Sequence, residues 1–275
     1  MSKLHVAGLV VLVTLVAGVA AGGIGAGMAT AVTLAAGQGE EPEPEHTVES
    51  AALGELRRVA VRLPAGYDAQ PGRRYPLVVT LDGPSHVAHT AASAEALASL
   101  GLAPKAIVVG VFNEPGQRDR DLLPAEAGGG QADRFLAFLT DELRPALDSL
   151  YRTDGTAALA GHSYGGLFAT YAWLERPEAF DVALAFSPSF WVEDQALLDR
   201  LERELPGARG ALYLAAGADE GREMQGGLER ARELLEEAPP AVRWHADVTP
   251  HADHGTTPRR ATPAALRFWA EGRSE

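Results

Sequence analysis

The chain has 275 residues, of which 46% are hydrophobic, and its formal net charge at pH 7 is −13. This length and composition suffice for one globular domain with a sizeable core. The acidic balance argues against nucleic acid or an anionic membrane surface as a partner, because both carry negative charge. The chain contains no cysteine, which excludes disulfides, cysteine nucleophiles and thiolate metal sites.

The N-terminal segment is apolar and uncharged over residues 6–39, and Lys3 precedes it. Residues 1–37 are therefore expected to form either a signal peptide or an uncleaved membrane anchor, with a buried core helix as a third interpretation. Signal and anchor both place the remainder of the chain outside the cytoplasm, either secreted or held at the membrane. Residues 38–46 are expected to form an acidic linker, and residues 47–275 one folded domain.

After the linker, apolar runs typical of strands alternate with longer segments of helical periodicity. Strands are expected over residues 57–63, 76–81, 106–112, 156–160, 180–186, 210–216 and 242–248. Helices are expected over residues 91–102, 132–151 (kinked at Pro145), 167–174, 193–205, 222–237 and 261–272. Residues 113–124 are expected to be irregular, and residues 128–130 to form a flexible joint. This alternation predicts an α/β fold with a mostly parallel central sheet and helices on both faces.

The motif that organises the chain is Gly-His-Ser-Tyr-Gly-Gly at residues 161–166, between an expected strand and an expected helix. G-x-S-x-G in this setting is typical of a nucleophile elbow, in which glycines two positions either side of the serine avoid collisions. Ser163 is therefore the candidate nucleophile. The Tyr164 N–H, at the start of the helix, is a candidate oxyanion donor. The alternative is a glycine-rich turn that carries a serine by chance. His162 is expected to pack beside the elbow and orient it.

A serine hydroxyl needs a base, and the base needs an acid that orients it. His254 is the favoured base because it follows the last expected strand and precedes Gly255, which we expect to free the loop. A surface histidine and a metal pair of His251 and His254 are alternatives, although no other ligand cluster supports a metal. Glu220 is the favoured acid and Asp219 the alternative, while a Ser–His dyad would leave both carboxylates merely solvated.

The turn Asp82-Gly83-Pro84 follows the expected strand 76–81 and is a candidate for the second oxyanion donor. Pro84 has no N–H, so the donor would be Gly83 or Asp82; an ordinary turn is the alternative. Candidates for substrate contact lie in three loops: Asp82, Arg120 and Trp191. Arg118, Arg120 and Asp121 form either an internal ion pair or a contact to the polar end of a substrate. Trp191 either lines the pocket or is a buried aromatic, and His86 and His89 either touch substrate or are bystanders.

Taken together, these motifs resemble the putative-esterase family of α/β-hydrolases, in the branch that contains siderophore (enterobactin-type) esterases. The resemblance covers most of the chain after the linker and rests on residues 61–64 with Tyr67, 81–83, Asn113 with 118–124, 161–166, 187–189 with Trp191, and 254–255. Leu123 stands where the family usually has Thr, and Thr256 where it often has Ser. These departures concern substrate preference and leave the chemistry unchanged.

The resemblance implies an α/β-hydrolase catalytic domain with Ser163 as nucleophile, His254 as base and an oxyanion hole from Tyr164 and the Asp82-Gly83 turn. Glu220 matches a family glutamate, although some members resemble Ser–His dyads. The expected function is cleavage of a small-molecule carboxylic ester through an acyl-enzyme, without a cofactor, and a siderophore-type ester is the named candidate. The negative net charge weighs against anionic ferric complexes as substrates. The alternatives are an acyltransferase of the same fold and a catalytically silent cell-surface binding protein.

Overall fold

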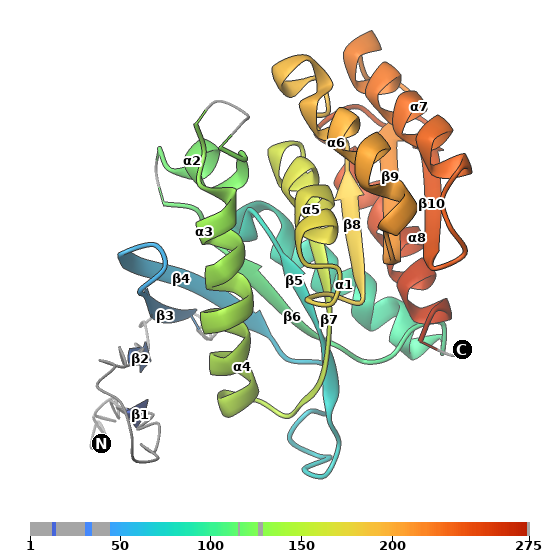
Figure 1. Ribbon diagram of the computed structural model, residues 1–275. Helices are drawn as coiled ribbons and strands as arrows, with labels where there is room; N and C mark the ends of the chain where they lie inside the picture. The colour runs from blue at the N-terminus through green and yellow to red at the C-terminus, as the bar shows by residue number, and fades with distance from the viewer. Residues whose placement is uncertain (1–12, 15–30, 35–44, 115, 126–128, 274–275) are drawn as a thin grey trace, which may run out of the picture.

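In the computed structural model, which describes residues 13–14, 31–34, 45–114, 116–125 and 129–273, one twisted sheet runs through the whole molecule (Figure 1). Within these residues the sheet has ten strands in the order β1-β2-β3-β4-β6-β5-β7-β8-β9-β10. Neighbours from β6 to β10 are parallel, and β3, β4 and β6 pair antiparallel. Helices cover both faces, as the alternation of strands and helices predicted.

The parallel strands of the sheet are short and largely apolar. The strands after the N-terminal segment are β3 Glu45–Ser50, β4 Glu55–Arg62, β5 Tyr75–Thr80, β6 Ile107–Val111, β7 Thr153–His162, β8 Val182–Phe186, β9 Gly210–Gly217 and β10 Val242–Thr249. Every residue of β5, β6 and β8 is buried. Uninterrupted burial is expected of strands that helices cover on both faces.

The helices form two layers, one on each face of the sheet. They are α1 Gly83–Ser99, α2 Arg118–Leu122, α3 Ala132–Ala137, α4 Arg144–Leu150, α5 Tyr164–Glu175, α6 Ala196–Glu204, α7 Arg222–Glu236 and α8 Thr257–Glu271. Buried residues of α1 and α8 belong to one apolar cluster, and those of α3 to α7 to the other. The two clusters are the cores on the two sides of the sheet.

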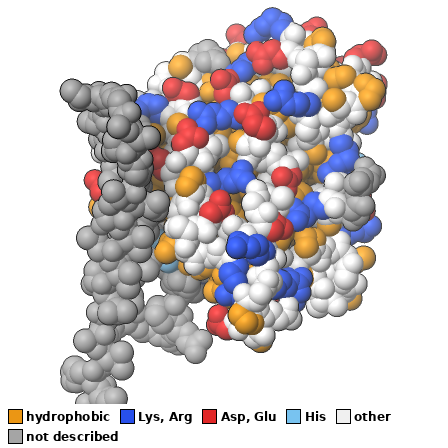
Figure 2. Space-filling view, turned by 60° about the horizontal axis from the view of Figure 1, so that its bottom comes forward, with side chains coloured by type: hydrophobic (Ala, Val, Ile, Leu, Met, Phe, Trp, Pro, Cys, Tyr) orange, Lys and Arg blue, Asp and Glu red, His pale blue; other side chains and the backbone are white. Residues whose placement is uncertain are grey.

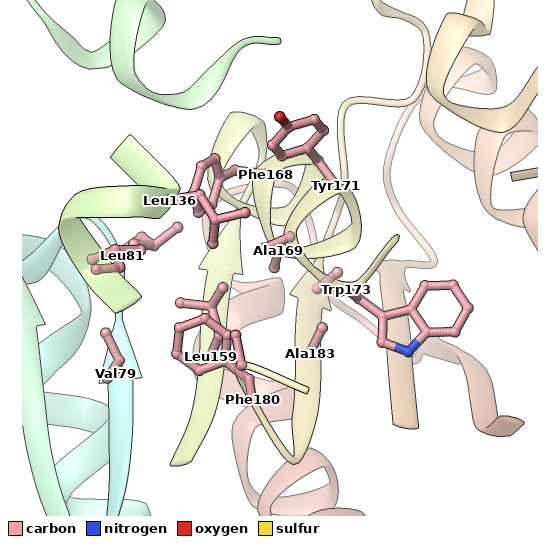
Figure 3. Packing of buried hydrophobic residues seen from close by; sticks show 14 of the residues in the cluster. Val79, Leu81, Leu136, Leu159, Phe168, Ala169, Tyr171, Trp173, Phe180 and Ala183 are labelled. Atoms are coloured by element: carbon pink, nitrogen blue, oxygen red, sulfur yellow. The ribbon is translucent and has the colours of Figure 1, made fainter. Parts of the chain in front are cut away.

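Alternation along β5 shows how the sheet divides these cores. Val79 joins the cluster under α3 to α7, whereas its neighbour Val78 joins the cluster under α1 and α8, because successive strand residues point to opposite faces. In Figure 3, Val79 and Leu159 on the strands lie below Phe168 and Ala169 of α5. The helix that follows the elbow therefore packs on buried apolar side chains of the sheet.

Several helices begin at other positions than the sequence predicted. α1 begins at Gly83 and α8 at Thr257, in both cases with a proline in the first turn, where its fixed φ favours a helix start. α6 begins only at Ala196, because the three residues before it have positive φ. Residues 118–122, expected to be irregular, form α2.

The helix expected over residues 132–151, with a kink at Pro145, contains a π-helical turn at Phe138–Leu143. Pro145 stands just after this turn, in the first turn of α4. Proline lacks an N–H and crowds the carbonyl four residues earlier, so the wider turn in front of it accommodates the ring.

The N-terminal region differs from the expectation where it is described. Strand β3 begins at Glu45 and pairs with β4, so it takes in the last two residues of the expected linker 38–46. Within the expected signal or anchor 1–37, the described residues form the short strands β1 Val13–Thr14 and β2 Ala31–Leu34; the remainder, like Gly128 of the expected joint, lies outside the described residues. Among the helices that the structure describes, none is both long and apolar enough to cross a membrane.

Acidic and basic side chains are interspersed on the surface. Figure 2 shows Lys and Arg next to Asp and Glu over the face turned toward the viewer. Arg200, for example, donates to Glu175 at 2.6 Å and to Glu204 at 2.9 Å. Such exposed pairs add little stability individually, so the apolar cores remain the main source of stability.

Candidate active site

Five neighbouring strands end at the same edge of the sheet, and each is followed by a candidate site residue. In sheet order, β5, β7, β8, β9 and β10 lead into segments that carry Asp82, Ser163, Ser189, Glu220 and His254. Residues near these ends pair directly: Thr80 with Ala160, His162 with Phe186, Phe186 with Ala215, and Thr249 with Gly217. The carboxyl edge of a parallel sheet is where α/β proteins bind their ligands.

Ser163 occupies a strained turn between β7 and α5. Its φ of 60° and ψ of −119° lie outside the regions that non-glycine residues favour. A Cβ at Gly161 would lie 2.0 Å from the Gly165 carbonyl oxygen, and one at Gly166 would lie 2.9 Å from the Phe186 carbonyl oxygen. The sequence predicted the sharp turn, with collisions that require glycine at both 161 and 165. A Cβ at Gly165, however, would make only an ordinary 3.4 Å contact, with Asp82 Oδ2. The steric demand for glycine therefore falls on Gly161 and Gly166.

Ser163 is partly exposed, and its hydroxyl contacts Ser189 in the loop that follows β8. Ser163 Oγ lies 3.1 Å from Ser189 Oγ, and the Ser163 carbonyl oxygen accepts from the Ser189 N–H at 3.2 Å. The Ser163 N–H donates to the Phe186 carbonyl oxygen at 2.9 Å. The elbow is thus fixed to the end of β8 by its backbone and by its side chain.

Glu220 contacts His254 directly: Glu220 Oε2 lies 2.8 Å from His254 Nδ1. The other carboxylate oxygen, Oε1, accepts hydrogen bonds from Ser187 Oγ at 2.6 Å, the Gly217 N–H at 2.5 Å and Thr257 Oγ1 at 2.8 Å. Burial alone would raise the pKa of Glu220, but the hydrogen bonds from His254, Ser187, Gly217 and Thr257 together lower it to about 2. Glu220 is therefore a carboxylate at neutral pH.

Asp219, the alternative acid, is exposed, and its N–H donates to the Ala252 carbonyl oxygen at 2.9 Å. This bond ties the turn that carries Glu220 to the loop that carries His254. A Cβ at Gly217 would lie 2.1 Å from the same Ala252 oxygen, so the close approach of the two loops requires glycine there. The structure thus selects Glu220 over Asp219 as the partner of His254.

The His254 side chain is 45% exposed, and its ring lies against His162, with centroids 4.5 Å apart. His254 is therefore placed beside the residue that precedes Ser163. Gly255 does not have a left-handed φ, and a Cβ there would meet only Asp253 at 3.7 Å, so the expectation that this glycine frees the loop is not supported. In the described part of the chain, no group of three or more metal-ligating side chains surrounds His251 and His254.

His162, His86 and His89 form a partly buried row of rings beside the elbow. The rings of His86 and His162 are 5.5 Å apart, and His86 Nδ1 lies 3.0 Å from His89 Nε2. Burial, followed by repulsion from neighbouring positive groups, lowers the pKa of His162 to about 3 and that of His89 to about 4. The lowered pKa values keep these partly buried side chains neutral at neutral pH. The orienting role expected for His162 and the two alternatives for His86 and His89 stay predictions.

Asp82 lies at the start of α1 with a left-handed φ of 51°. Its carboxylate accepts two hydrogen bonds from Arg118, at 2.7 and 2.8 Å, and Arg118 also donates to the His162 carbonyl oxygen at 3.2 Å. Gly83 and Tyr164 are the first residues of α1 and α5, and these two helices follow the neighbouring strands β5 and β7. Their N–H groups belong to the first turns, whose donors have no partner within the helix.

Arg120 and Trp191, two of the residues expected to contact substrate, have different surroundings. Arg120 donates to Glu55 and Asp121, each at 2.7 Å, and the fully buried Asp121 also lies 2.6 Å from the buried Arg57. Arg120 therefore belongs to the internal ion-pair network, which was one of the two alternatives for it. Trp191 is not a buried aromatic: it is 43% exposed.

Trp191 lies beside the elbow, with its ring centroid 6.1 Å from that of Tyr164. The Arg118 guanidinium lies 5.4 Å from the centre of the same Tyr164 ring. A partly exposed surface of two aromatic rings and one arginine therefore lies next to Ser163. Ser187, Ser189 and Thr257 were not assigned a role from the sequence. The signals for the two serines were their position directly after an apolar strand and their place among the residues that carry the family resemblance.

A mostly parallel sheet, a strained serine at a strand-to-helix turn, and an acid and a histidine after two later strands define the α/β-hydrolase class. A family model described as putative esterase matches residues 50–260, and the chain belongs to this esterase family.

Curated relatives and solved structures agree with this assignment. The chain is 46% identical over 94 residues to the siderophore enterobactin esterase of Emericella nidulans, covering 33% of this chain and 30% of that protein. It is 30% identical over 113 residues to the ferri-bacillibactin esterase BesA of Bacillus subtilis, covering 39% of each. The aligned part therefore spans well under half of these relatives.

An IroE-like serine hydrolase from Shewanella oneidensis superimposes with a TM-score of 0.75 at 26% identity, covering 84% of this chain and 80% of that one. The enterobactin esterase of Shigella flexneri shares the fold, with a TM-score of 0.66 at 23% identity, and covers 86% of this chain and 62% of that one. Together with the family match, these similarities place the chain in the siderophore-esterase-like branch, as its motifs predicted.

Proposed function

We propose that the protein is a serine carboxylic-ester hydrolase that works through an acyl-enzyme. The observation that carries this proposal is the placement of the strained Ser163 turn at the same sheet edge as the Glu220–His254 pair, whose Oε2 and Nδ1 atoms are 2.8 Å apart. An ionised acid that orients a base, at the same sheet edge as a partly exposed serine, is the arrangement by which a hydroxyl can be activated.

In this mechanism Ser163 Oγ attacks the carbonyl carbon of the ester, and His254 Nε2 accepts the Ser163 proton. Glu220 accepts the hydrogen bond from His254 Nδ1–H, so it fixes the tautomer and stabilises the imidazolium. The imidazolium then gives its proton to the leaving alkoxide, which departs as the alcohol. In the second half of the reaction, water attacks the acyl carbonyl carbon and His254 accepts the water proton. The imidazolium then returns this proton to the Ser163 oxygen as it leaves, and the carboxylic acid is released. The N–H groups of Tyr164 and Gly83, at two helix starts, are the proposed donors to the oxyanion.

As substrate we propose a small-molecule ester of the siderophore type. Two relatives that the chain resembles are named as esterases of enterobactin and ferri-bacillibactin. The surface of Tyr164, Trp191 and Arg118 beside Ser163 supports a planar acyl group with a polar substituent. The net charge of −13 disfavours the anionic ferric complex relative to the metal-free ester.

The test uses the full chain, a fluorophosphonate probe, p-nitrophenyl esters of several chain lengths, and enterobactin with and without iron. We expect wild type to be labelled and to release acid, and Ser163→Ala to do neither while keeping the same circular dichroism spectrum. A folded wild type that is neither labelled nor active would contradict the proposal and favour a silent binding protein. Transfer of the acyl group to an added alcohol at low concentration would favour an acyltransferase.

We also propose that the enzyme acts outside the cytoplasm, because residues 6–39 are uncharged and follow Lys3. Fractionation of cells that express the full chain tests this proposal. Recovery of the esterase activity with the cytoplasmic fraction would contradict it.

A further inference from the structure

The segment Ser187-Pro188-Ser189, which follows β8, lies between the two ends of the proposed catalytic machinery. In the sheet, β8 stands between β7, which leads to Ser163, and β9, which leads to Glu220. Both serines are buried, with Ser187 0% and Ser189 1% exposed. Buried hydroxyl groups are costly unless they are hydrogen-bonded, so their partners indicate what these residues do.

Ser187 contacts the acid. Ser187 Oγ donates to Glu220 Oε1 at 2.6 Å, while Glu220 Oε2 faces His254 Nδ1. The bond occupies the oxygen that His254 does not use, and it holds the carboxylate plane in the orientation that presents Oε2 to the imidazole. Hydrogen bonds to a carboxylate are short and strong, and they favour its ionised form.

Ser189 contacts the nucleophile. Ser189 Oγ lies 3.1 Å from Ser163 Oγ, and the Ser189 N–H donates to the Ser163 carbonyl oxygen at 3.2 Å. When Ser163 transfers its proton to the base, its oxygen gains negative charge, and a hydroxyl at this distance is a donor to that charge. Ser189 therefore touches the reacting atom itself.

The backbone of the segment is held so that the two hydroxyls point in different directions. Ser187 has a left-handed φ of 43°, which is strained for a non-glycine residue, and its N–H donates to the Ala215 carbonyl oxygen at 2.6 Å. Pro188 packs against the elbow helix, since a Cβ at Gly166 would lie 3.0 Å from the Pro188 Cα. Neither serine can move without disturbing β9 or α5.

We propose that this segment is a two-ended positioning element for the hydrolase: Ser187 orients Glu220 and acts through it on His254, and Ser189 is a further catalytic residue that donates to Ser163 Oγ. This inference rests on the proposed function. It assigns roles to a motif whose purpose the sequence left open.

The experiment compares Ser187→Ala and Ser189→Ala with wild type and with Ser50→Ala, in the full chain. Ser50 is a matched control, because it is also buried, at 1% exposed, and donates to a glutamate, with Ser50 Oγ 2.5 Å from Glu142 Oε2. It ends β3, which three strands separate from β7 in the sheet. Readouts are kcat and KM on a p-nitrophenyl ester and the rate of fluorophosphonate labelling. Ser187→Gly is added because glycine suits the positive φ, so it removes the hydroxyl without backbone strain.

We expect Ser187→Ala, Ser187→Gly and Ser189→Ala each to lower kcat about tenfold, with KM changed less than about twofold. Ser189→Ala is expected to slow labelling by a similar factor, and Ser50→Ala to leave kcat unchanged. In a Glu220→Gln background, Ser187→Ala is expected to change kcat by less than about twofold, because its effect passes through the missing carboxylate.

The positioning role of Ser187 is overturned if Ser187→Ala reduces kcat by the same factor with and without Glu220, or if Ser187→Gly is as active as wild type. The role of Ser189 is overturned if folded Ser189→Ala is labelled as fast as wild type. All of these results leave the proposed hydrolase intact. A wild type that is itself unlabelled and inactive, in contrast, overturns both proposals.

Discussion

Glu220 reaches across from the end of β9 so that its Oε2 lies 2.8 Å from Nδ1 of His254, which follows β10. The contact is possible because the two strands are adjacent and in register to their last residues, with Gly217 opposite Thr249. The acid is nearly fully buried, whereas the histidine is 45% exposed. The pair therefore joins a buried carboxylate to a ring that remains accessible to solvent.

The first prediction concerns the identity of the acid. Glu220→Gln should lower kcat by a factor on the order of 10² to 10⁴, because an amide cannot stabilise the imidazolium as a carboxylate does. Asp219→Asn is the matched control and should keep kcat, since the Asp219 side chain is exposed and only its N–H is used. The measurement is kcat on a p-nitrophenyl ester. Equal activity of Glu220→Gln and wild type would instead indicate a Ser–His dyad.

The second prediction concerns the contact between the acid and base loops. Gly217→Ala should destabilise the protein by roughly 1–3 kcal/mol or more, because its Cβ would lie 2.1 Å from the Ala252 carbonyl oxygen. Gly226→Ala, in the exposed middle of α7 where a Cβ meets nothing within 4 Å, should leave Tm unchanged or raise it. Thermal unfolding by circular dichroism measures both. A Tm for Gly217→Ala equal to wild type would show that the loops separate easily.

The third prediction is a loss of stability as the pH falls. The pKa of His89 is lowered from 6.5 to about 4, chiefly by burial. Between these values the unfolded chain binds a proton that the folded protein does not, so the free energy of unfolding decreases as pH falls from about 6.5 to about 4 and this contribution then levels off. Burial acts on His162 in the same direction, and its pKa of about 3 extends the window further down.

Tm measured from pH 7.5 to pH 4 tests this expectation, with His89→Gln as the variant. Because glutamine does not titrate, the variant should lose less Tm over this interval than wild type. His245→Gln, a histidine outside the cluster, serves as a control for the loss of any histidine. Identical pH slopes for His89→Gln and wild type would rule out His89 as a source of acid sensitivity.

The fourth prediction concerns the ion-pair network that contains Arg120, Asp121, Arg57 and Glu55. Asp121→Asn should destabilise the protein by about 3–5 kcal/mol, because Asp121 and Arg57 are both fully buried and their charges lie 2.6 Å apart. Asp141→Asn removes the exposed partner of Arg176 and should cost less than about 1 kcal/mol. Urea denaturation of both variants gives the two free energies. Similar small losses in both would mean that Arg57 is neutralised adequately by Glu55.

Much of the fold was accessible from the sequence because its signals are local. Apolar runs gave the parallel strands, and the helix periodicity gave the α/β architecture, which the structure confirms. Helix starts were less accessible, since the early starts of α1 and α8 depend on prolines placed after strands. Strand β3 was missed because residues 45–50 are polar in sequence and become a strand through pairing with β4.

The sharp turn at Ser163 could be predicted from local sequence, because its glycines and the start of the following helix lie within residues 161–166. Contacts between residues far apart in the chain depend instead on the tertiary structure. Three such sets of contacts are those of Glu220 with His254, of Arg120 with Glu55 and Asp121, and of Ser187 and Ser189 with Glu220 and Ser163. Sheet order brings these loops within hydrogen-bond distance, and it is set by the packing of the whole core.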